Sequence, residues 1–153
     1  MPVFNSLVLN KPLIIAATSW LVAGVLKVFV ELRVNKKLSI SRIVGAGGMP
    51  SSHTSTVVAL AISIGFYQGL DSAEFALAMI FAIIVIHDAV GVRLETGKQA
   101  KVLNTMMFES EAFKDLDFEK QLKEYVGHTP SQALAGAIVG IIVSLVMVFV
   151  IYK

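Results

Sequence analysis

The chain has 153 residues, of which 56% are hydrophobic and 16% are charged, and its mean hydropathy is +0.75. Soluble domains carry about 45–50% apolar and about 25% charged residues, so this composition favours lipid over water as the solvent. It excludes intrinsic disorder, and the lack of cysteine excludes disulfides and thiolate chemistry. A net charge of +2 gives no indication of nucleic-acid binding. We therefore predict a single integral membrane domain over residues 1–153.

Four apolar stretches predict an all-α, polytopic helix bundle with about four transmembrane helices. A spanning helix needs about 20 largely apolar residues, with about 17–25 tolerated. The first, third and fourth stretches meet this requirement, whereas the second is short and is also compatible with a buried or re-entrant segment. The stretches are Pro12 to Val30, Thr54 to Tyr67, Ala73 to Val90 and Ala133 to Tyr152.

Lysine and arginine are concentrated in two of the three connections, those that follow the first and the third stretch. Because Lys and Arg counts in short loops set orientation, both connections are predicted to face the cytoplasm. Within the second of them, apolar residues alternate with charges from Met106 to Tyr125. This pattern predicts amphipathic helical structure, either at the headgroup level or solvated on the cytoplasmic side.

Small residues predict which helices lie close together. Gly136 and Gly140 have the spacing of a small-xxx-small contact, and the first stretch is also rich in alanine and glycine. We therefore expect the first and last helices to pack against each other. A bundle of only four helices is also compatible with a homodimer that closes a lipid cleft.

Polar residues gather at the ends of all four stretches, and the predicted topology places them on the cytoplasmic side. Ionisable groups at membrane depth are costly and usually mark functional sites. These groups are Lys27, the segment Gly47 to Thr54, the pair His87 and Asp88 followed by Arg93 and Lys98, and the segment Gly127 to Gln132.

Each of these groups also has a simpler structural interpretation. Lys27 can extend to the interface, and the serines and threonines can be ordinary helix caps. Arg93 and Lys98 can anchor to anionic headgroups. Asp88 is harder to explain in this way, because a carboxylate at the end of a hydrophobic run needs a cationic partner. Since all these interpretations would have to hold on one face, a shared site is favoured.

The cationic and hydroxyl groups have the chemistry of a phosphate site. Backbone N–H groups at the helix start near Ser51 and Ser52 form an anion site together with the helix dipole. Lys27, Arg93 and Lys98 can add positive charge, and arginine can bind two phosphate oxygens at once. Cations placed in this way stabilise the equatorial oxygens during phosphoryl transfer.

Two histidines from separate helix starts, His53 and His128, can divide the work of catalysis. One can act as the nucleophile and the other as the general acid. Asp88 can orient either imidazole or pair with Arg93. The chain has no His-Glu-x-x-His motif and no second clear carboxylate for a magnesium ion, so we predict neither a metal nor another cofactor.

These motifs resemble those of a known family. Pro-Ser-Ser-His53 resembles the Pro-Ser-Gly-His motif of the type 2 phosphatidic acid phosphatase (PAP2) and vanadium haloperoxidase superfamily. More closely, three segments together resemble the divergent PAP2 family of small membrane proteins. They are the segment Gly47 to His53, the segment Asp88 to Asn104, and Gly-His-Thr-Pro130.

The resemblance implies a metal-independent phosphatase that acts on a membrane lipid phosphate, such as phosphatidylglycerophosphate or phosphatidate, through a phosphohistidine. It implies that His128 is the nucleophile and that His53 protonates the leaving oxygen. Lys27, Ser51 and Ser52 correspond to groups that bind the phosphate.

The chain departs from the superfamily pattern near its last motif, where Gln132 stands in place of an aspartate and Gln121 and Leu122 stand in place of a Ser-Arg pair. We infer that Asp88 and Arg93 take over these roles. Two alternatives stay open. One is a non-catalytic protein, including a transport-associated one, that binds an anion or a phospholipid headgroup. The other is a structural bundle whose polar ends are caps and anchors.

Overall fold

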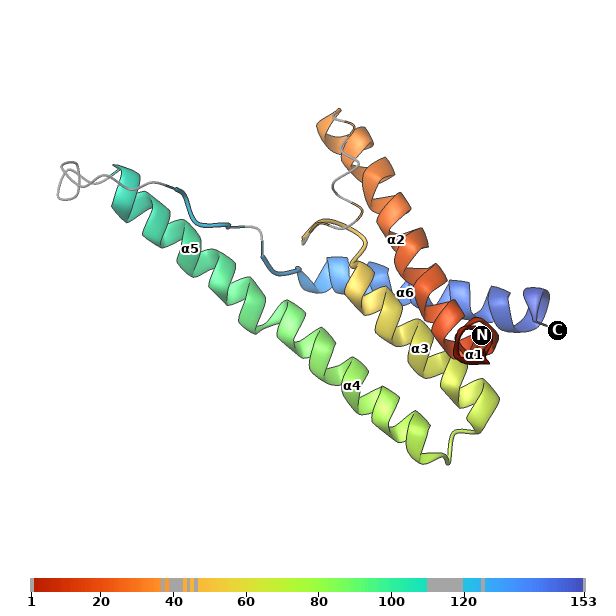
Figure 1. Cartoon of the computed structure of the whole chain (residues 1–153). Helices are drawn as coiled ribbons and strands as arrows, with labels where there is room; N and C mark the ends of the chain where they lie inside the picture. Colours follow the sequence, from red (N-terminus) through yellow and green to blue (C-terminus); the bar gives the residue numbers. More distant parts are fainter. Residues whose placement is uncertain are drawn as a thin grey trace.

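The structure, a computed structural model, describes residues 2–36, 38, 43, 45, 47–109, 120–124 and 126–152. Within these residues the secondary structure is helical and contains no strand, which confirms the all-α prediction. The helices are α1 (Pro2–Leu9), α2 (Lys11–Asn35), α3 (Ser52–Gln68), α4 (Ala73–Val90), α5 (Val92–Glu109) and α6 (Pro130–Val146), and α6 continues into a short π-helix, η3 (Met147–Ile151) (Figure 1).

Side-chain caps define where four of the helices begin. Asn10, Ser51, Ser72 and Thr129 precede α2, α3, α4 and α6, and each side-chain oxygen accepts a hydrogen bond from the N–H three residues later. At α6 the side chain of Gln132 returns a bond to the backbone N–H of the cap, which completes a capping box. These bonds satisfy N–H groups that have no partner within the first helical turn.

Three helical segments among the described residues are long and apolar enough to cross a membrane: Lys11–Asn35, Ala73–Glu109 and Pro130–Ile151. The second predicted stretch also forms a helix, but α3 has only 17 residues. At 1.5 Å per residue it is about 26 Å long, which is shorter than the hydrocarbon core of about 30 Å. The structure therefore supports three candidate spanning segments where the sequence predicts about four.

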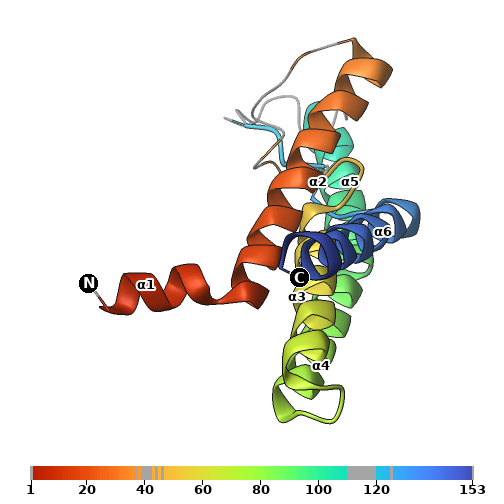
Figure 2. The same ribbon diagram turned by 90° about the vertical axis from the view of Figure 1, so that its right-hand side faces the viewer.

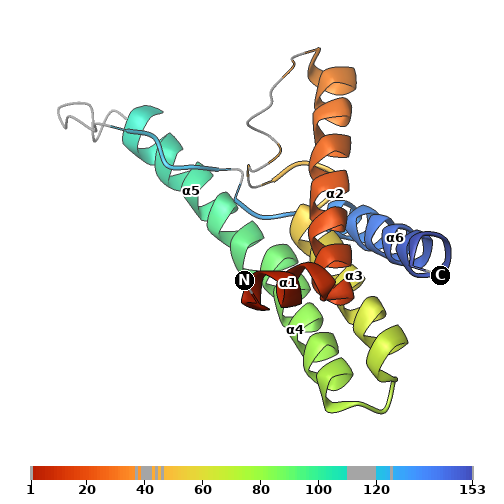
Figure 3. The ribbon, with the colours of Figure 1, turned by 45° about the vertical axis from the view of Figure 1, so that its right-hand side comes forward.

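α3 is the central helix, and it packs against α2, α4 and α6. The views in Figures 1 and 3 show that α4 and α5 follow one another along nearly the same line, so that α5 extends beyond the other helices. α6 runs across this direction towards the C-terminus (Figure 1). α1 turns sharply away from the start of α2 (Figure 2).

Two buried serines join α2 to α3. The hydroxyl oxygens of Ser19 and Ser55 lie 2.6 Å apart, and each lies within hydrogen-bond distance of the other residue's backbone carbonyl, at 3.1 and 3.3 Å. Both side chains are fully buried. Because a hydroxyl without a partner is costly in an apolar interior, this pair determines which faces of α2 and α3 meet.

Two glycines let α6 approach α3 closely. A Cβ atom on Gly136 would lie 2.4 Å from the carbonyl oxygen of Ser51, and one on Gly140 would lie 2.6 Å from that of Ser55. The glycine pair thus makes a close helix contact as predicted, but the contact is with α3. α6 also touches α2, the partner expected from the sequence. The difference arises because α3 presents serine and alanine to α6 and so permits the closer approach.

The connection between α4 and α6 differs from the prediction. Its basic first part is helical and forms α5, whereas residues 120–124 are not helical. The Asn104 side chain holds the segment 120–124 through two hydrogen bonds to Leu122. Its oxygen accepts from the backbone N–H of Leu122 at 2.8 Å, and its amide nitrogen donates to the carbonyl of Leu122 at 2.9 Å. Gly97 leaves room for the carbonyl of Glu124. Most of the predicted amphipathic stretch, residues 110–119 and 125, lies outside the described residues.

Candidate functional site

His53 and His128 lie side by side, although they are far apart in the sequence. Their ring centroids are 6.4 Å apart, with the ring planes inclined at 58°. His53 is the second residue of α3, and His128 lies just before the start of α6. Both face a small cavity of about 30 Å³, which has room for about two water molecules. The cavity is lined by His53, Val85, Asp88, Ala89, Arg93, Val126 and His128.

His128 is buried and is held by several neighbours. Its backbone N–H donates to the carbonyl of Ala89 at 3.0 Å, which ties the loop before α6 to the end of α4. Its Nδ1 lies 3.3 Å from Oε1 of Gln132, and the same oxygen accepts the N–H of Thr129 at 3.2 Å. An amide oxygen at this point accepts from Nδ1–H, so the neutral tautomer with its proton on Nδ1 fits this contact. Nε2 is then the nitrogen with a lone pair.

Burial lowers the pKa of His128 below the usual imidazole value of about 6.5. The hydrogen bond to Gln132 and a weaker one to the backbone of Gly48 raise the pKa, while the positive charge of Lys27 and the neighbouring His53 lower it further. The net direction is downward, so the imidazole is neutral near pH 7. A neutral imidazole is the form that can act as a nucleophile.

Asp88 and Arg93 pair with each other where α4 passes into α5. The Nε–H of Arg93 donates to Oδ2 of Asp88, and both side chains are partly exposed. Of the three arrangements that the sequence leaves open for Asp88, the structure has the one with Arg93. The guanidinium carries five N–H donors, and Arg93 lines the same cavity as both histidines. Asp88 can therefore orient Arg93 while Arg93 binds an anion.

Lys27 is buried, with 3% of its surface exposed, and does not extend into water. Its Nζ donates to the carbonyl of Gly45 at 3.2 Å. Its aliphatic part passes Gly48, where a Cβ atom would lie 3.3 Å from Cγ and Cδ of the lysine. Gly48 has a φ of +82°, a conformation that favours glycine. α2 thus brings a positive charge next to the loop that contains Gly48 and close to His128.

The two serines at the start of α3 have different environments. Oγ of Ser51 accepts from the backbone N–H of Thr54 at 3.3 Å and from its hydroxyl at 3.1 Å, so Ser51 caps the helix. Oγ of Ser52 is buried and has no hydrogen-bond partner among the described residues. An unsatisfied buried hydroxyl is costly unless a ligand or water bonds to it. Of the two serines, Ser52 is therefore the one with an uncommitted hydroxyl, and neither serine lines the cavity of the histidines.

Lys98 does not line the cavity of the histidine pair. Its Nζ is 2.7 Å from Oε1 of Glu95, and it lines a neighbouring cavity of about 330 Å³ together with Lys101. Lys98 follows Arg93 by five residues, which places the two about 140° apart around α5. The structure therefore brings Arg93 to the histidines and leaves Lys98 outside their cavity.

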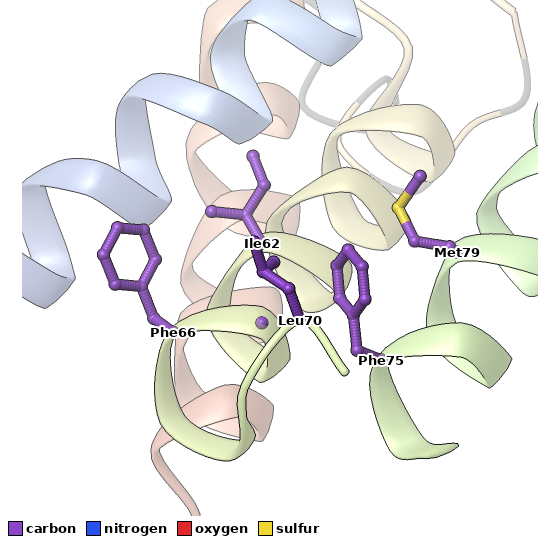
Figure 4. A pocket seen from close by; sticks show the side chains of 6 residues that line it. Ile62, Phe66, Leu70, Phe75 and Met79 are labelled. Carbon is purple, nitrogen blue, oxygen red and sulfur yellow. The ribbon is translucent and has the colours of Figure 1, made fainter. Parts of the chain in front are cut away.

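A second large cavity lies at the opposite end of α3 and has no acid–base chemistry (Figure 4). It measures about 310 Å³ and is lined by Ile62, Gly65, Phe66, Leu70, Phe75 and Met79. In the part of the chain that the structure describes, no group of three or more His, Asp or Glu residues could hold a metal ion. The two histidines converge at the other end of α3.

The fold and these motifs define a small helical membrane protein with a polar cluster at its helix starts. Residues 8–143 match the divergent PAP2 family, and the chain therefore belongs to that family. It is 37% identical over 153 residues to the "Uncharacterized membrane protein YuiD" of Bacillus subtilis (strain 168). That alignment covers 94% of this chain and 97% of the relative. No solved structure matches the chain.

The sequence reasoning missed the role of Gln132, which it treats only as a departure from the superfamily. Two local signals could have found it. Thr129 and Gln132 have the spacing of a capping box, and Gln132 follows His128 by four residues, as a side chain that reaches back to the imidazole would.

Proposed function

We propose that the protein is a membrane phosphatase that hydrolyses a lipid phosphomonoester through a phosphohistidine intermediate. The observation that carries this proposal is the juxtaposition of His53 and His128 at 6.4 Å on one cavity. At this separation both imidazoles can contact one phosphoryl group bound at the cavity. Membership of the divergent PAP2 family supports the same reaction.

His128 is the nucleophile in this proposal. Gln132 holds Nδ1–H, so the lone pair of Nε2 attacks the phosphorus atom. As the N–P bond forms, the bond between phosphorus and the oxygen of the lipid alcohol breaks. The amide oxygen of Gln132 keeps its hydrogen bond to Nδ1–H while the ring gains positive charge.

His53 is the general acid and base. In the first step, its imidazolium gives a proton to the departing lipid oxygen. In the second step, the neutral imidazole takes a proton from the water that attacks the phosphohistidine. Inorganic phosphate leaves, and both histidines return to their starting protonation states. Burial and the positive charges of Arg93 and Lys27 lower the pKa of His53. The negative charge of a bound phosphate raises this pKa again, so the imidazolium that the first step needs forms when the substrate binds.

The phosphate oxygens are bound by groups from three helices. Arg93 provides N–H donors next to the histidines, and Lys27 provides a buried positive charge. The N-terminus of α3 provides backbone N–H groups, together with the hydroxyl of Ser52. Such donors stabilise the charge that spreads over the equatorial oxygens in phosphoryl transfer.

The membrane setting supports a lipid substrate such as phosphatidylglycerophosphate or phosphatidate. The two histidines adjoin the starts of the apolar helices α3 and α6, which supports a site at the depth where a headgroup meets water. The excess of lysine and arginine in two connections favours a site on the cytoplasmic face.

The test is a phosphatase assay with purified protein in lipid nanodiscs and an excess of chelator. We expect phosphatidate or phosphatidylglycerophosphate to release inorganic phosphate, and acid-labile phosphohistidine to be trapped in the wild type. His128→Ala should abolish both signals. His87→Ala is the matched control, because His87 is exposed on α4 outside the cavity, and it should keep activity.

Two outcomes would contradict the proposal: no turnover of either lipid by the wild type, and full activity of His128→Ala. If the wild type binds phosphate through Arg93 and Lys27 yet forms no phosphohistidine, the protein is a headgroup or anion binder instead. This alternative shares the anion-binding groups, so the covalent intermediate is what separates the two.

A further inference from the structure

A cavity with a polar lining, distinct from those described above, lies at the end of α3 that is far from the histidines. It measures about 370 Å³ and lies between the end of α1, the start of α2 and the end of α3. Its polar lining comes from Ser6, Asn10, Lys11, Tyr67 and Gln68. Tyr67 follows His53 by 14 residues on α3, so the two sites are about 21 Å apart along the helix axis. The phosphatase proposal does not use this cavity.

Lys11 is the charged residue in this cavity lining, and two aromatic rings hold it. Its Nζ lies 5.1 Å from the centre of the Tyr67 ring and 5.4 Å from that of Tyr152. Lys11 is exposed, and the two rings keep its ammonium group at the edge of the cavity. Among the described residues that line the cavity, none has a carboxylate side chain.

Two further features of this cavity favour an anion. The hydroxyl of Tyr67 is buried and has no hydrogen-bond partner in the described part of the chain. A phenolic O–H can donate to an anionic oxygen, which would remove the cost of leaving it unsatisfied. α2 begins at Lys11, so the positive end of its dipole is at the cavity.

The position of the cavity suits a lipid headgroup. α1 turns away from α2 at this end of the bundle (Figure 2), and Leu7, Val8 and Leu9 are exposed on it. A short helix with exposed apolar side chains next to a spanning helix belongs at the boundary of headgroups and acyl chains. The cavity at the junction of α1 and α2 then lies at headgroup depth.

We propose that this cavity binds the phosphate of an anionic lipid headgroup in the leaflet opposite the histidine pair. Lys11 and the hydroxyl of Tyr67 contact the phosphate oxygens. A free phosphate ester in solution has the same oxygen chemistry, so the experiment separates the two sources. The proposal is independent of the phosphatase reaction.

Native mass spectrometry of the full chain can measure this binding with phosphatidylglycerol and phosphatidylcholine as probes. Phosphatidylglycerol is a phosphodiester and is not a substrate of the proposed phosphatase. Both lipids carry the same phosphate oxygens, but the choline cation cancels the headgroup charge of phosphatidylcholine and is repelled by Lys11. We therefore expect the wild type to bind phosphatidylglycerol about tenfold more tightly than phosphatidylcholine. Lys11→Gln should lose this preference. Tyr67→Phe keeps the ring and removes only the hydroxyl, and it should weaken binding about threefold.

Lys120→Gln is the control, because it removes the same charge from an exposed residue outside this cavity and should behave as the wild type. The site is overturned if Lys11→Gln keeps the wild-type preference or if Lys120→Gln loses it equally. Glycerol phosphate is the soluble probe. If it displaces phosphatidylglycerol at equal concentration, the assignment to a lipid is overturned, and if it does not compete, the lipid source is supported.

Discussion

Nδ1 of His128 lies 3.3 Å from Oε1 of Gln132, and the same oxygen accepts the backbone N–H of Thr129. The imidazole is therefore oriented by a neutral amide. An amide oxygen fixes the tautomer as a carboxylate does, but it provides less stabilisation of the imidazolium. This arrangement favours a neutral His128, which is the form that the proposed nucleophile needs.

Gln132 is expected to be a positioning residue whose effect is visible in the pH profile. Gln132→Ala should lower kcat for lipid phosphate hydrolysis about tenfold, because one hydrogen bond that orients the nucleophile is lost. Gln132→Glu should keep the hydrogen bond that orients the imidazole and raise the pKa of His128. The fall in kcat at acidic pH should then begin at a higher pH than in the wild type. An unchanged profile in Gln132→Glu would show that the residue only caps α6.

Activity should persist to acidic pH. The pKa of His128 is lowered by burial, and the nucleophile must be neutral. As pH falls through about 6.5, a histidine in water becomes protonated, but His128 stays neutral until the pH reaches its lowered pKa. The rate of phosphohistidine formation in single-turnover experiments should therefore decline only below about pH 6.5. If the rate has already fallen fully as the pH is lowered to about 6.5, the proposal that His128 is the nucleophile is contradicted.

Lys27 is expected to influence both phosphate binding and the titration of His128. Lys27→Met keeps the aliphatic length beside Gly48 and removes the positive charge. The KM for a lipid phosphate should rise, and the acidic limb should move to higher pH because the charge that disfavours imidazolium is gone. Kinetics at several pH values would measure both effects, with Lys36→Met, which removes the same charge from an exposed position after α2, as the control.

Asp88 is expected to act through Arg93. Arg93→Ala should raise KM strongly because a phosphate-binding group is lost, and Asp88→Asn should raise it less because Arg93 is only loosened. The double variant should be no worse than Arg93→Ala, since the two residues form one unit. A double-mutant cycle on KM and kcat tests this. Additive effects, or a loss confined to kcat in Asp88→Asn, would instead indicate that Asp88 orients a histidine.

The contact of α6 with α3 should be sensitive to a single methyl group. Gly136→Ala places a Cβ atom 2.4 Å from the carbonyl oxygen of Ser51, so the helices must separate. We expect a loss of about 1–3 kcal/mol in the free energy of unfolding, together with lower activity, because Ser51 begins the helix that carries His53. Thermal unfolding in detergent can measure the change. Leu134→Ala on the exposed face of α6 should be close to neutral.

Most of the local structure follows from the sequence alone. Apolar runs locate α2, α3, α4 and α6, and serine and threonine caps mark where α3 and α6 begin, because both signals depend on residues within a few positions of one another. The motifs at those starts also identify His53 and His128 as a pair and indicate the family. These are properties of the chain that need no knowledge of how the helices are rotated.

Only the tertiary structure decides which side chains meet. The rotation of each helix about its axis places Arg93 at the histidines and Lys98 outside their cavity, and it pairs Asp88 with Arg93. It also turns Gly136 towards α3 and lets Gln132 reach His128. A pattern of apolar residues is satisfied over a wide range of rotations in lipid, where apolar surface can face either a neighbouring helix or the acyl chains. Buried hydroxyls and close glycine contacts remove that freedom, and they act only once the helices are packed together.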